Sequence, residues 1–146
     1  MKKGIVRAVN VSEKTGEIKI PVESALLIED FGIKGDAHGG FGHRQVSLLA
    51  QESVDKMIAM GISGLTEGVF AENITTEGLE LYTLPVGTKL RIGETLHEVS
   101  QIGKECHKGC AIMQQVGMCI MPKEGIFTKV IKGGTIQAGD EIEILE

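Results

Sequence analysis

Reactive side chains gather in three short segments of the 146-residue chain. The first is a glycine-rich stretch, residues 35–40, which contains His38 and is followed closely by His43 and Arg44. Glycine lets a backbone approach a ligand closely, and the planar guanidinium of arginine matches a phosphate with two hydrogen bonds. The segment therefore favours a small-anion site. A polar turn in which Asp36 caps backbone N–H groups explains the same residues, and the Gly-Lys-Ser/Thr ending of a P-loop is absent.

The second segment places a thiol among cationic neighbours. Cys106 follows Lys104 and precedes His107 and Lys108. Nearby positive charge favours the thiolate, which is the reactive and metal-binding form of cysteine. The plainer interpretation is a small buried hydrophobic side chain, which is what free cysteine often is.

Zinc binding is a competing interpretation of the cysteines. Cys106, Cys110 and Cys119, with one histidine, would supply four ligands. The three residues between the first two thiols suit a ligand pair, but no second pair matches it. An odd number of cysteines also argues against a disulfide framework, and free thiols fit a reducing cytoplasm.

The third segment covers residues 121–127. Pro122 and Gly125 predict a shaped turn that presents Lys123. A solvated loop is the alternative, and it is the better interpretation for Glu124.

Short strands, frequent turns and one helix must position these side chains. The convincing helix is Gln51–Met60, where Val54, Met57 and Ile58 form one apolar face and Gly61 is placed to end the helix. Strands are expected at residues 5–11, 17–22, 45–49, 70–74, 89–92, 96–102 and 141–145, a strand or helical turn at 126–131, and a short helix at 111–118. Twenty glycines mark the turns between them. The pattern predicts a mostly-β (α+β) barrel or sandwich-like fold with one main helix and short helical segments.

Composition narrows the function classes. The length favours one domain, residues 1–146. A net charge of −5 and an aromatic content of 3% argue against nucleic acid as a partner, because neither a basic surface nor stacking platforms are expected. No apolar run reaches the roughly 18 residues of a membrane span, and residues 1–3 lead into no apolar signal-peptide core. These features predict a cytoplasmic protein that does not bind membranes.

Taken in order, the segments resemble the MOSC domain, named for the C-terminal domain of molybdenum cofactor sulfurase. The resemblance is carried by Gly35–His38 with residues 43–47, Glu72–Thr75 with residues 78–79, the stretch 84–93, and residues 101–106 ending in the cysteine. It runs over nearly the whole chain.

The resemblance implies a β-barrel-like fold and a role in binding the molybdenum cofactor (molybdopterin) or carrying sulfur. It implies that Cys106 ligates the metal or carries a persulfide as the catalytic residue. The other cofactor-binding residues would be Arg44, His43, His38, Asn73, Lys104 and Lys123. The ligand would be a small anionic pterin, and the protein partners would be molybdenum cofactor biosynthesis proteins or molybdoenzymes.

Two other functions remain open at this level. One is a molybdenum-dependent reductase of N-hydroxylated compounds that receives electrons from an external donor. The other is a non-enzymatic module that binds zinc or a partner protein.

Overall fold

The computed structural model describes residues 3–14, 17–40, 42–62, 65–103 and 121–145. Lys104, Cys106, Cys110, Cys119 and the helix expected at 111–118 lie outside these residues. Among the described residues, no helix is long and apolar enough to cross a membrane.

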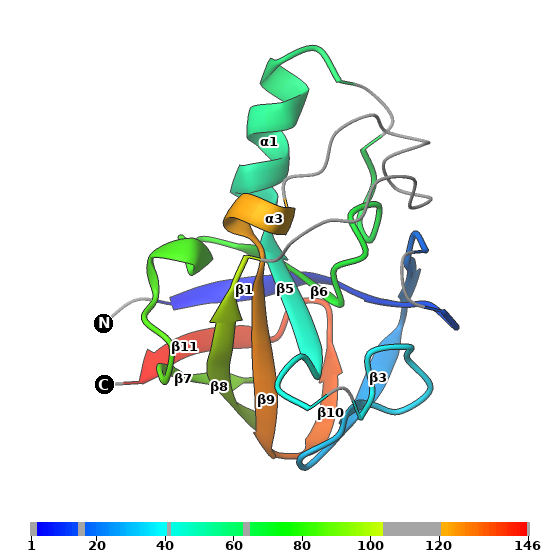
Figure 1. The fold of residues 1–146 in the computed structure, drawn as a ribbon, viewed down its shortest axis with the longest axis vertical. Helices are drawn as coiled ribbons and strands as arrows, with labels where there is room; N and C mark the ends of the chain where they lie inside the picture. Colours follow the sequence, from blue (N-terminus) through cyan, green and yellow to red (C-terminus); the bar gives the residue numbers. More distant parts are fainter. Residues whose placement is uncertain (1–2, 15–16, 41, 63–64, 104–120, 146) are drawn as a thin grey trace.

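Seven strands of the described chain close into a β-barrel (Figure 1), which confirms the expected mostly-β fold. Around the barrel the order is β11-β7-β8-β9-β5-β6-β1, and β1 pairs again with β11. The strands are β1 (Lys3–Val11), β5 (Val46–Ala50), β6 (Ile74–Glu77), β7 (Lys89–Ile92), β8 (Thr95–Ile102), β9 (Ile126–Lys132) and β11 (Glu141–Leu145). Described neighbours pair antiparallel except β5 and β6, which are parallel.

Four further strands extend this frame. The strand β2 (Ile20–Val22) pairs with the end of β1, and it begins three residues later than the strand expected at 17–22. A separate three-stranded sheet has the order β10 (Gly134–Gln137), β3 (Ser24–Ile28) and β4 (Gly32–Ile33). None of β3, β4 and β10 was among the expected strands. The two residues of β4 are too few to show an alternating pattern, and β10 contains a single large aliphatic residue, Ile136.

The barrel interior is filled by aliphatic side chains from alternating positions. In β7, Leu90 and Ile92 are fully buried while Lys89 and Arg91 face outward. This is the period of two that a half-buried strand requires. A second apolar cluster lies outside the barrel, under the helix: Leu49, Val54, Met57, Val69, Phe70, Ala71 and Phe127.

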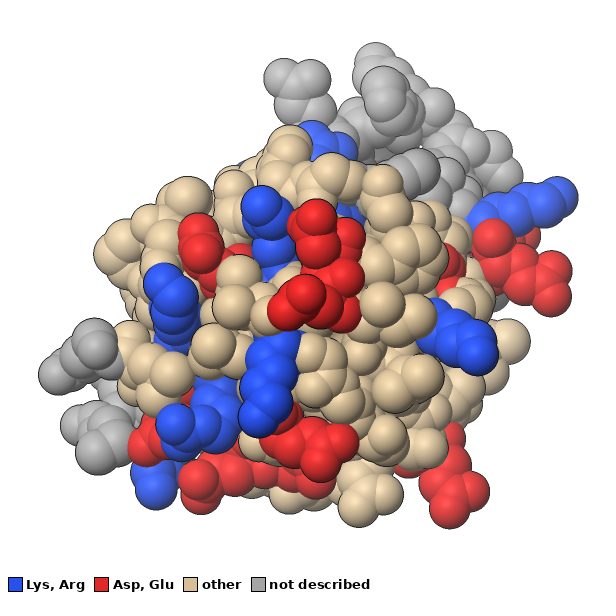
Figure 2. All heavy atoms as spheres, turned by 90° about the horizontal axis from the view of Figure 1, so that it is seen from below, with Lys and Arg blue, Asp and Glu red and all other residues tan. Residues whose placement is uncertain are grey.

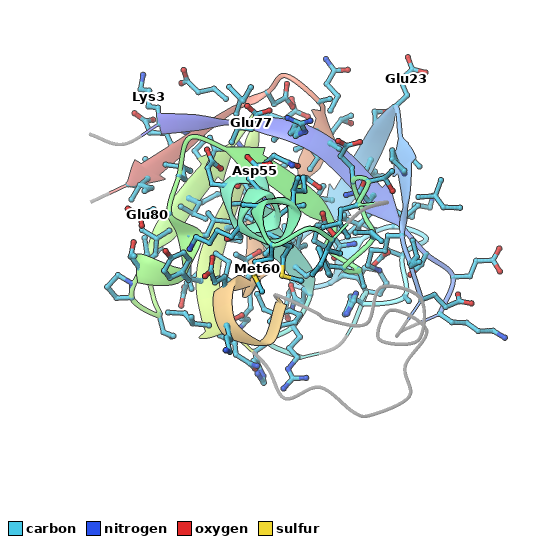
Figure 3. All side chains as sticks on the ribbon, turned by 90° about the horizontal axis from the view of Figure 1, so that it is seen from above. Lys3, Glu23, Asp55, Met60, Glu77 and Glu80 are labelled. Atoms are coloured by element: carbon cyan, nitrogen blue, oxygen red, sulfur yellow. The ribbon has the colours of Figure 1, made fainter. Side chains whose placement is uncertain are left out.

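The helix α1 (Gln51–Ala59) continues directly from β5 and stands at one end of the barrel (Figure 1). Figure 3 looks down on this end, where α1 is seen end-on beside the short helix α3 (Met121–Glu124). A 3₁₀ turn, η1 (Leu81–Thr83), packs against α3. The opposite end of the barrel carries Lys and Arg interspersed with Asp and Glu, so this face presents no extended basic patch (Figure 2).

The helix prediction is confirmed in its extent and wrong in one residue of its face. Gly61 follows the helix with a φ of 89°, in the left-handed region that suits its final turn. Val54 and Met57 are buried as expected, but Ile58 is 48% exposed. Ser53 takes the buried flank instead, because its hydroxyl donates to Glu124 at 2.6 Å and turns the helix toward α3.

The strand expected at residues 70–74 is also wrong. Residues 67–70 form a turn, and β6 begins only at Ile74. The carboxylate of Glu72 folds back and accepts the backbone N–H groups of Gly68 and Phe70, both at 3.2 Å. Those donors are therefore satisfied without a strand partner.

Candidate functional site

Five side chains from three parts of the barrel lie around the start of β9. We call this group the Arg44 site: His38, His43, Arg44, Gln101 and Phe127. The first three lie in the loop that enters β5, Gln101 lies near the end of β8, and Phe127 lies at the start of β9. Strand register brings them together, because Phe127 pairs with Gln101 on one side and with Ser47 on the other.

One amide oxygen contacts two side chains of the loop, those of Arg44 and His43. Gln101 Oε1 accepts a hydrogen bond from Arg44 Nε at 3.0 Å and lies 2.6 Å from His43 Nε2. An amide oxygen only accepts, so the proton of His43 lies on Nε2. The hydroxyl of Ser100 also donates to the carbonyl of His43, which fixes the loop against β8.

The guanidinium of Arg44 is stacked on an aromatic ring. Its Cζ lies 5.5 Å from the centre of the Phe127 ring, within range of a cation–π contact. Within the described part of the chain, its only hydrogen bond goes through Nε, and no carboxylate forms an ion pair with it. The two terminal nitrogens therefore have donors to offer an anion, in the fork that suits phosphate.

The imidazole of His38 lies on the other side of this group. It is 7% exposed, and its ring is tilted against Phe127 with 6.1 Å between the ring centres. The carboxylate of Asp36 accepts the backbone N–H of His38 at 2.9 Å and lies 3.6 Å from its Nδ1. Asp36 therefore caps backbone N–H groups of the turn, as the polar-turn interpretation predicted. Its carboxylate also lies beside the imidazole.

A lysine that the sequence analysis overlooked completes this corner. Lys19 is 1% exposed, and its Nζ donates to Asp36 Oδ1 at 2.8 Å and to Ser12 Oγ at 2.9 Å. Burial opposes ionisation of the carboxyl, but hydrogen bonds from His38 and Lys19 outweigh it and hold the pKa of Asp36 well below its usual range.

Asn73 is fully buried and acts as a connection between strands. Its Oδ1 accepts the N–H of Ser47 at 2.9 Å and the hydroxyl of Ser47 at 3.1 Å. Its amide donates to the carbonyl of Asn10 at 3.1 Å. These bonds join β1 to β5 and thereby set the start of the strand that follows Arg44.

Lys123 is exposed on α3, and no described hydrogen bond or ion pair joins it to the Arg44 site. Its neighbour Glu124 accepts from Ser53 and forms an ion pair with Lys56 at 2.9 Å. Glu124 is thus part of the contact between α3 and α1, not the solvated loop residue that was expected.

No group of three or more His, Cys, Asp or Glu among the described residues is placed to hold a metal. Cys106 and Lys104 lie outside the described residues, and so do the other two cysteines. The thiol ligand and the zinc alternative both remain predictions.

Gln101 and Phe127 were missed as site residues. Gln101 lies within the segment that carries the family resemblance, and that was the signal available for it. Phe127 gave no such signal, because its role as the surface between Arg44 and His38 arises from pairing between distant segments.

Comparison with known proteins gives a family and a fold. Residues 34–143 match the model of the MOSC domain. The chain is 25% identical over 142 residues to the uncharacterized protein YflK of Bacillus subtilis, covering 90% of this chain and 64% of YflK, so it spans less than two thirds of that relative.

Solved structures share the fold. The YuaD protein of Bacillus subtilis has a TM-score of 0.83 and 16% identity, with 97% of this chain and 95% of YuaD covered. YiiM of Escherichia coli has a TM-score of 0.73 and 22% identity, with 100% and 71% covered. YiiM of Geobacillus stearothermophilus has a TM-score of 0.72 and 23% identity, with 98% and 75% covered.

Proposed function

The chain belongs to the MOSC domain family, a family associated with molybdenum cofactor binding, and from this premise we propose that it binds the pterin-based molybdenum cofactor. Its task would be maturation or delivery of that cofactor, with Cys106 as the metal ligand or as the carrier of a persulfide sulfur. When bound, the cofactor supplies a metal centre that accepts sulfur, oxygen and electrons.

The proposal is supported above all by the guanidinium of Arg44, which pairs with no carboxylate among the described residues. Buried or half-buried cations normally have a carboxylate partner, and this one is held by an amide oxygen and an aromatic ring. His43 adds a second donor on the same oxygen. In a protein of net charge −5, such a local cationic site suits a small anion such as the phosphate of a pterin cofactor.

Gln101 connects this anion site to the segment that carries the cysteine. Its amide nitrogen donates to the carbonyl of Gly103 at 2.7 Å, and Gly103 N–H donates to Gly125 O at the same distance. Cys106 follows Gly103 by three residues in the sequence. A thiolate at that position would be a soft ligand for molybdenum.

The test is the composition of the protein made in a host that synthesises the molybdenum cofactor. We expect molybdenum and pterin to copurify with the wild-type chain, or intact-mass spectrometry to show an added sulfur of roughly 32 Da on the thiol. Cys106→Ser should remove the metal ligation or the added mass. Arg44→Ala should lower the fraction of loaded chains.

Arg91→Ala is the matched control for Arg44→Ala. Arg91 is an exposed arginine that pairs with Glu143 at 2.6 Å on β7, and its loss should leave loading unchanged. Zinc alone, or nothing bound to the wild-type protein, would overturn the proposal. Reduction of an N-hydroxylated compound by the loaded protein and an artificial reductant would extend the proposal to the reductase function.

A further inference from the structure

A buried glutamine follows Arg44 directly, and its side chain holds the backbone of the loop. Gln45 is 2% exposed. Its Nε2 donates to the carbonyl of Gly42 at 2.8 Å and to Asp30 Oδ1 at 3.0 Å. Its Oε1 accepts the backbone N–H of Val130 at 3.0 Å. Both protons and the oxygen of the amide are therefore used in hydrogen bonds.

The contacts of this amide fix its orientation. The Gly42 carbonyl can only accept, so it must face Nε2, and the Val130 N–H can only donate, so it must face Oε1. A carboxylate has no proton to donate, and an aliphatic side chain has neither group. The full set of contacts therefore requires the amide of glutamine.

Asp30 and Val130 anchor the amide to the barrel. The backbone N–H of Asp30 donates to the carbonyl of Val130 at 2.9 Å, which joins the turn between β3 and β4 to β9. Asp30 has a φ of 52°, in the left-handed region that aspartate adopts more readily than most residues. A Cβ at Gly32 would lie 2.6 Å from the carbonyl oxygen of Gln45, so glycine lets this turn approach the loop closely.

The bond from Gln45 to Gly42 encloses the two residues whose side chains meet at Gln101. It ties the backbone on both sides of His43 and Arg44, whose nitrogens then reach one oxygen of Gln101. A guanidinium that is already held when an anion arrives loses less side-chain entropy on binding. A fixed turn therefore favours anion binding without contacting the anion.

We propose that Gln45 is a positioning residue for the Arg44 site: its anchored amide sets the turn at residues 42–45, so that His43 and Arg44 meet at one oxygen before a ligand binds. Gln45 acts only through the backbone of that turn. The benefit to a bound anion rests on the proposed function, whereas the order of the Arg44 side chain is a property of the chain alone.

The first test measures the order of the Arg44 side chain in the unloaded protein, from ¹⁵N relaxation of its Nε–H signal. The spectrum of Arg44→Lys assigns that signal. We expect a rigid Nε–H in the wild type and a mobile one in Gln45→Met, which removes all three bonds and adds no charge. Arg7 and Arg91 serve as internal references, and circular dichroism confirms the fold. An Arg44 signal that is equally rigid in the folded variant would overturn the proposal.

Asp30 gives a second test that keeps Gln45 in place and decides the matter if Gln45→Met does not fold. Asp30 is exposed, and Asp30→Ala removes an acceptor of Gln45 Nε2, so the Arg44 Nε–H should become more mobile. Asp30→Asn removes the same charge but keeps an accepting oxygen, so it should restore the rigid signal. Equal mobility of the Arg44 Nε–H in the two variants would contradict the inference.

Titration with inorganic phosphate connects this order to ligand binding. If the wild type binds phosphate, Gln45→Met should bind it roughly tenfold more weakly, because binding must then order the side chains of the turn. Leu90→Ala is the control for lost stability, since Leu90 is fully buried on β7 and its truncation leaves the loop intact. Its phosphate affinity should equal that of the wild type. Equal affinity in Gln45→Met would overturn the positioning role.

The two kinds of measurement separate this inference from the proposed function. If the wild type does not bind phosphate, the anion site of the proposed function fails. The relaxation measurements on the unloaded chain then decide alone whether Gln45 positions Arg44.

Discussion

A buried histidine inside the barrel makes stability depend on pH in a calculable way. His97 on β8 is 0% exposed and lies between two threonine hydroxyls. Thr95 donates its own proton to the carbonyl of Ile92 at 2.7 Å, so its oxygen accepts from His97 Nε2 at 2.9 Å. Thr128 lies 3.0 Å from Nδ1 and donates to it. Both ring nitrogens of a neutral His97 therefore have a hydrogen-bond partner.

Protonation of His97 is therefore opposed in the folded state. Burial lowers its pKa from 6.5 to about 3, so between these values the unfolded chain binds a proton that the folded chain does not. Stability is fully present above the unfolded pKa and falls as pH drops, by about 1.4 kcal/mol per pH unit. Between about pH 7.5 and pH 5, the loss from His97 should be about 2 kcal/mol.

The assay is urea unfolding of the wild type and of His97→Gln across this pH range. Glutamine is neutral throughout and keeps one donor and one acceptor for the two threonines. The difference in unfolding free energy between the two proteins cancels other titrating groups. One of these is Glu72, whose pKa is raised by burial and which acts in the opposite direction. A free-energy difference that does not change with pH would refute the argument that His97 stays neutral in the folded state.

Four further variants test buried contacts and one backbone position of positive φ by urea unfolding. Lys19→Met alone should destabilise the protein by about 4 kcal/mol, because it leaves Asp36 as a lone buried charge. Adding Asp36→Asn should recover most of that loss. A double variant no more stable than the single variant would contradict this reasoning. Asn73→Ala should cost about 3 kcal/mol because the buried N–H of Ser47 loses its acceptor, and a loss below about 1 kcal/mol would show that the bond contributes little. Ala71 has a φ of 66°, so Ala71→Gly should stabilise by about 0.5 kcal/mol, and a loss of stability would mean that the native backbone there is unstrained.

Elements whose pattern is local were predictable from the sequence. Residues 89–92 alternate charged and aliphatic side chains, and they form β7 at the expected bounds. The helix before Gly61 was found from its apolar spacing and its terminal glycine. Its exact rotation was not, because it depends on the bond from Ser53 to Glu124, which is 71 residues away.

Residues 66–73 show why the rest was not predictable. Phe70 and Ile74 suggest a strand, but Glu72 and Asn73 between them are fully buried. Glu72 accepts a backbone N–H of the turn before it, and Asn73 accepts the backbone N–H of Ser47 on another strand. Sequence periodicity treats such polar residues as solvent-facing, so a buried polar connection is mistaken for strand alternation.

Two residues of the candidate site, His43 and Arg44, were chosen from the sequence, whereas the residue that joins them was not. They were chosen for their residue types and for the glycine-rich loop before them, and in the structure both contact one side-chain oxygen. That oxygen belongs to Gln101, which arrives through the pairing of β8 with β9. Lys19 was not predicted to be buried either, since a lysine in a half-buried strand normally faces water.

The pairing of β1 with β11 has a consequence for how the chain is synthesised and folded. Lys3 lies opposite Glu143, so one seam of the barrel joins segments from nearly opposite ends of the sequence. A nascent chain leaving the ribosome would hold that edge of β1 unpaired until β11 emerges. Loop-closure entropy and high contact order both slow such a step. The same seam places the first and last described strands side by side, so a short linker could join them and new termini could be opened in a surface turn.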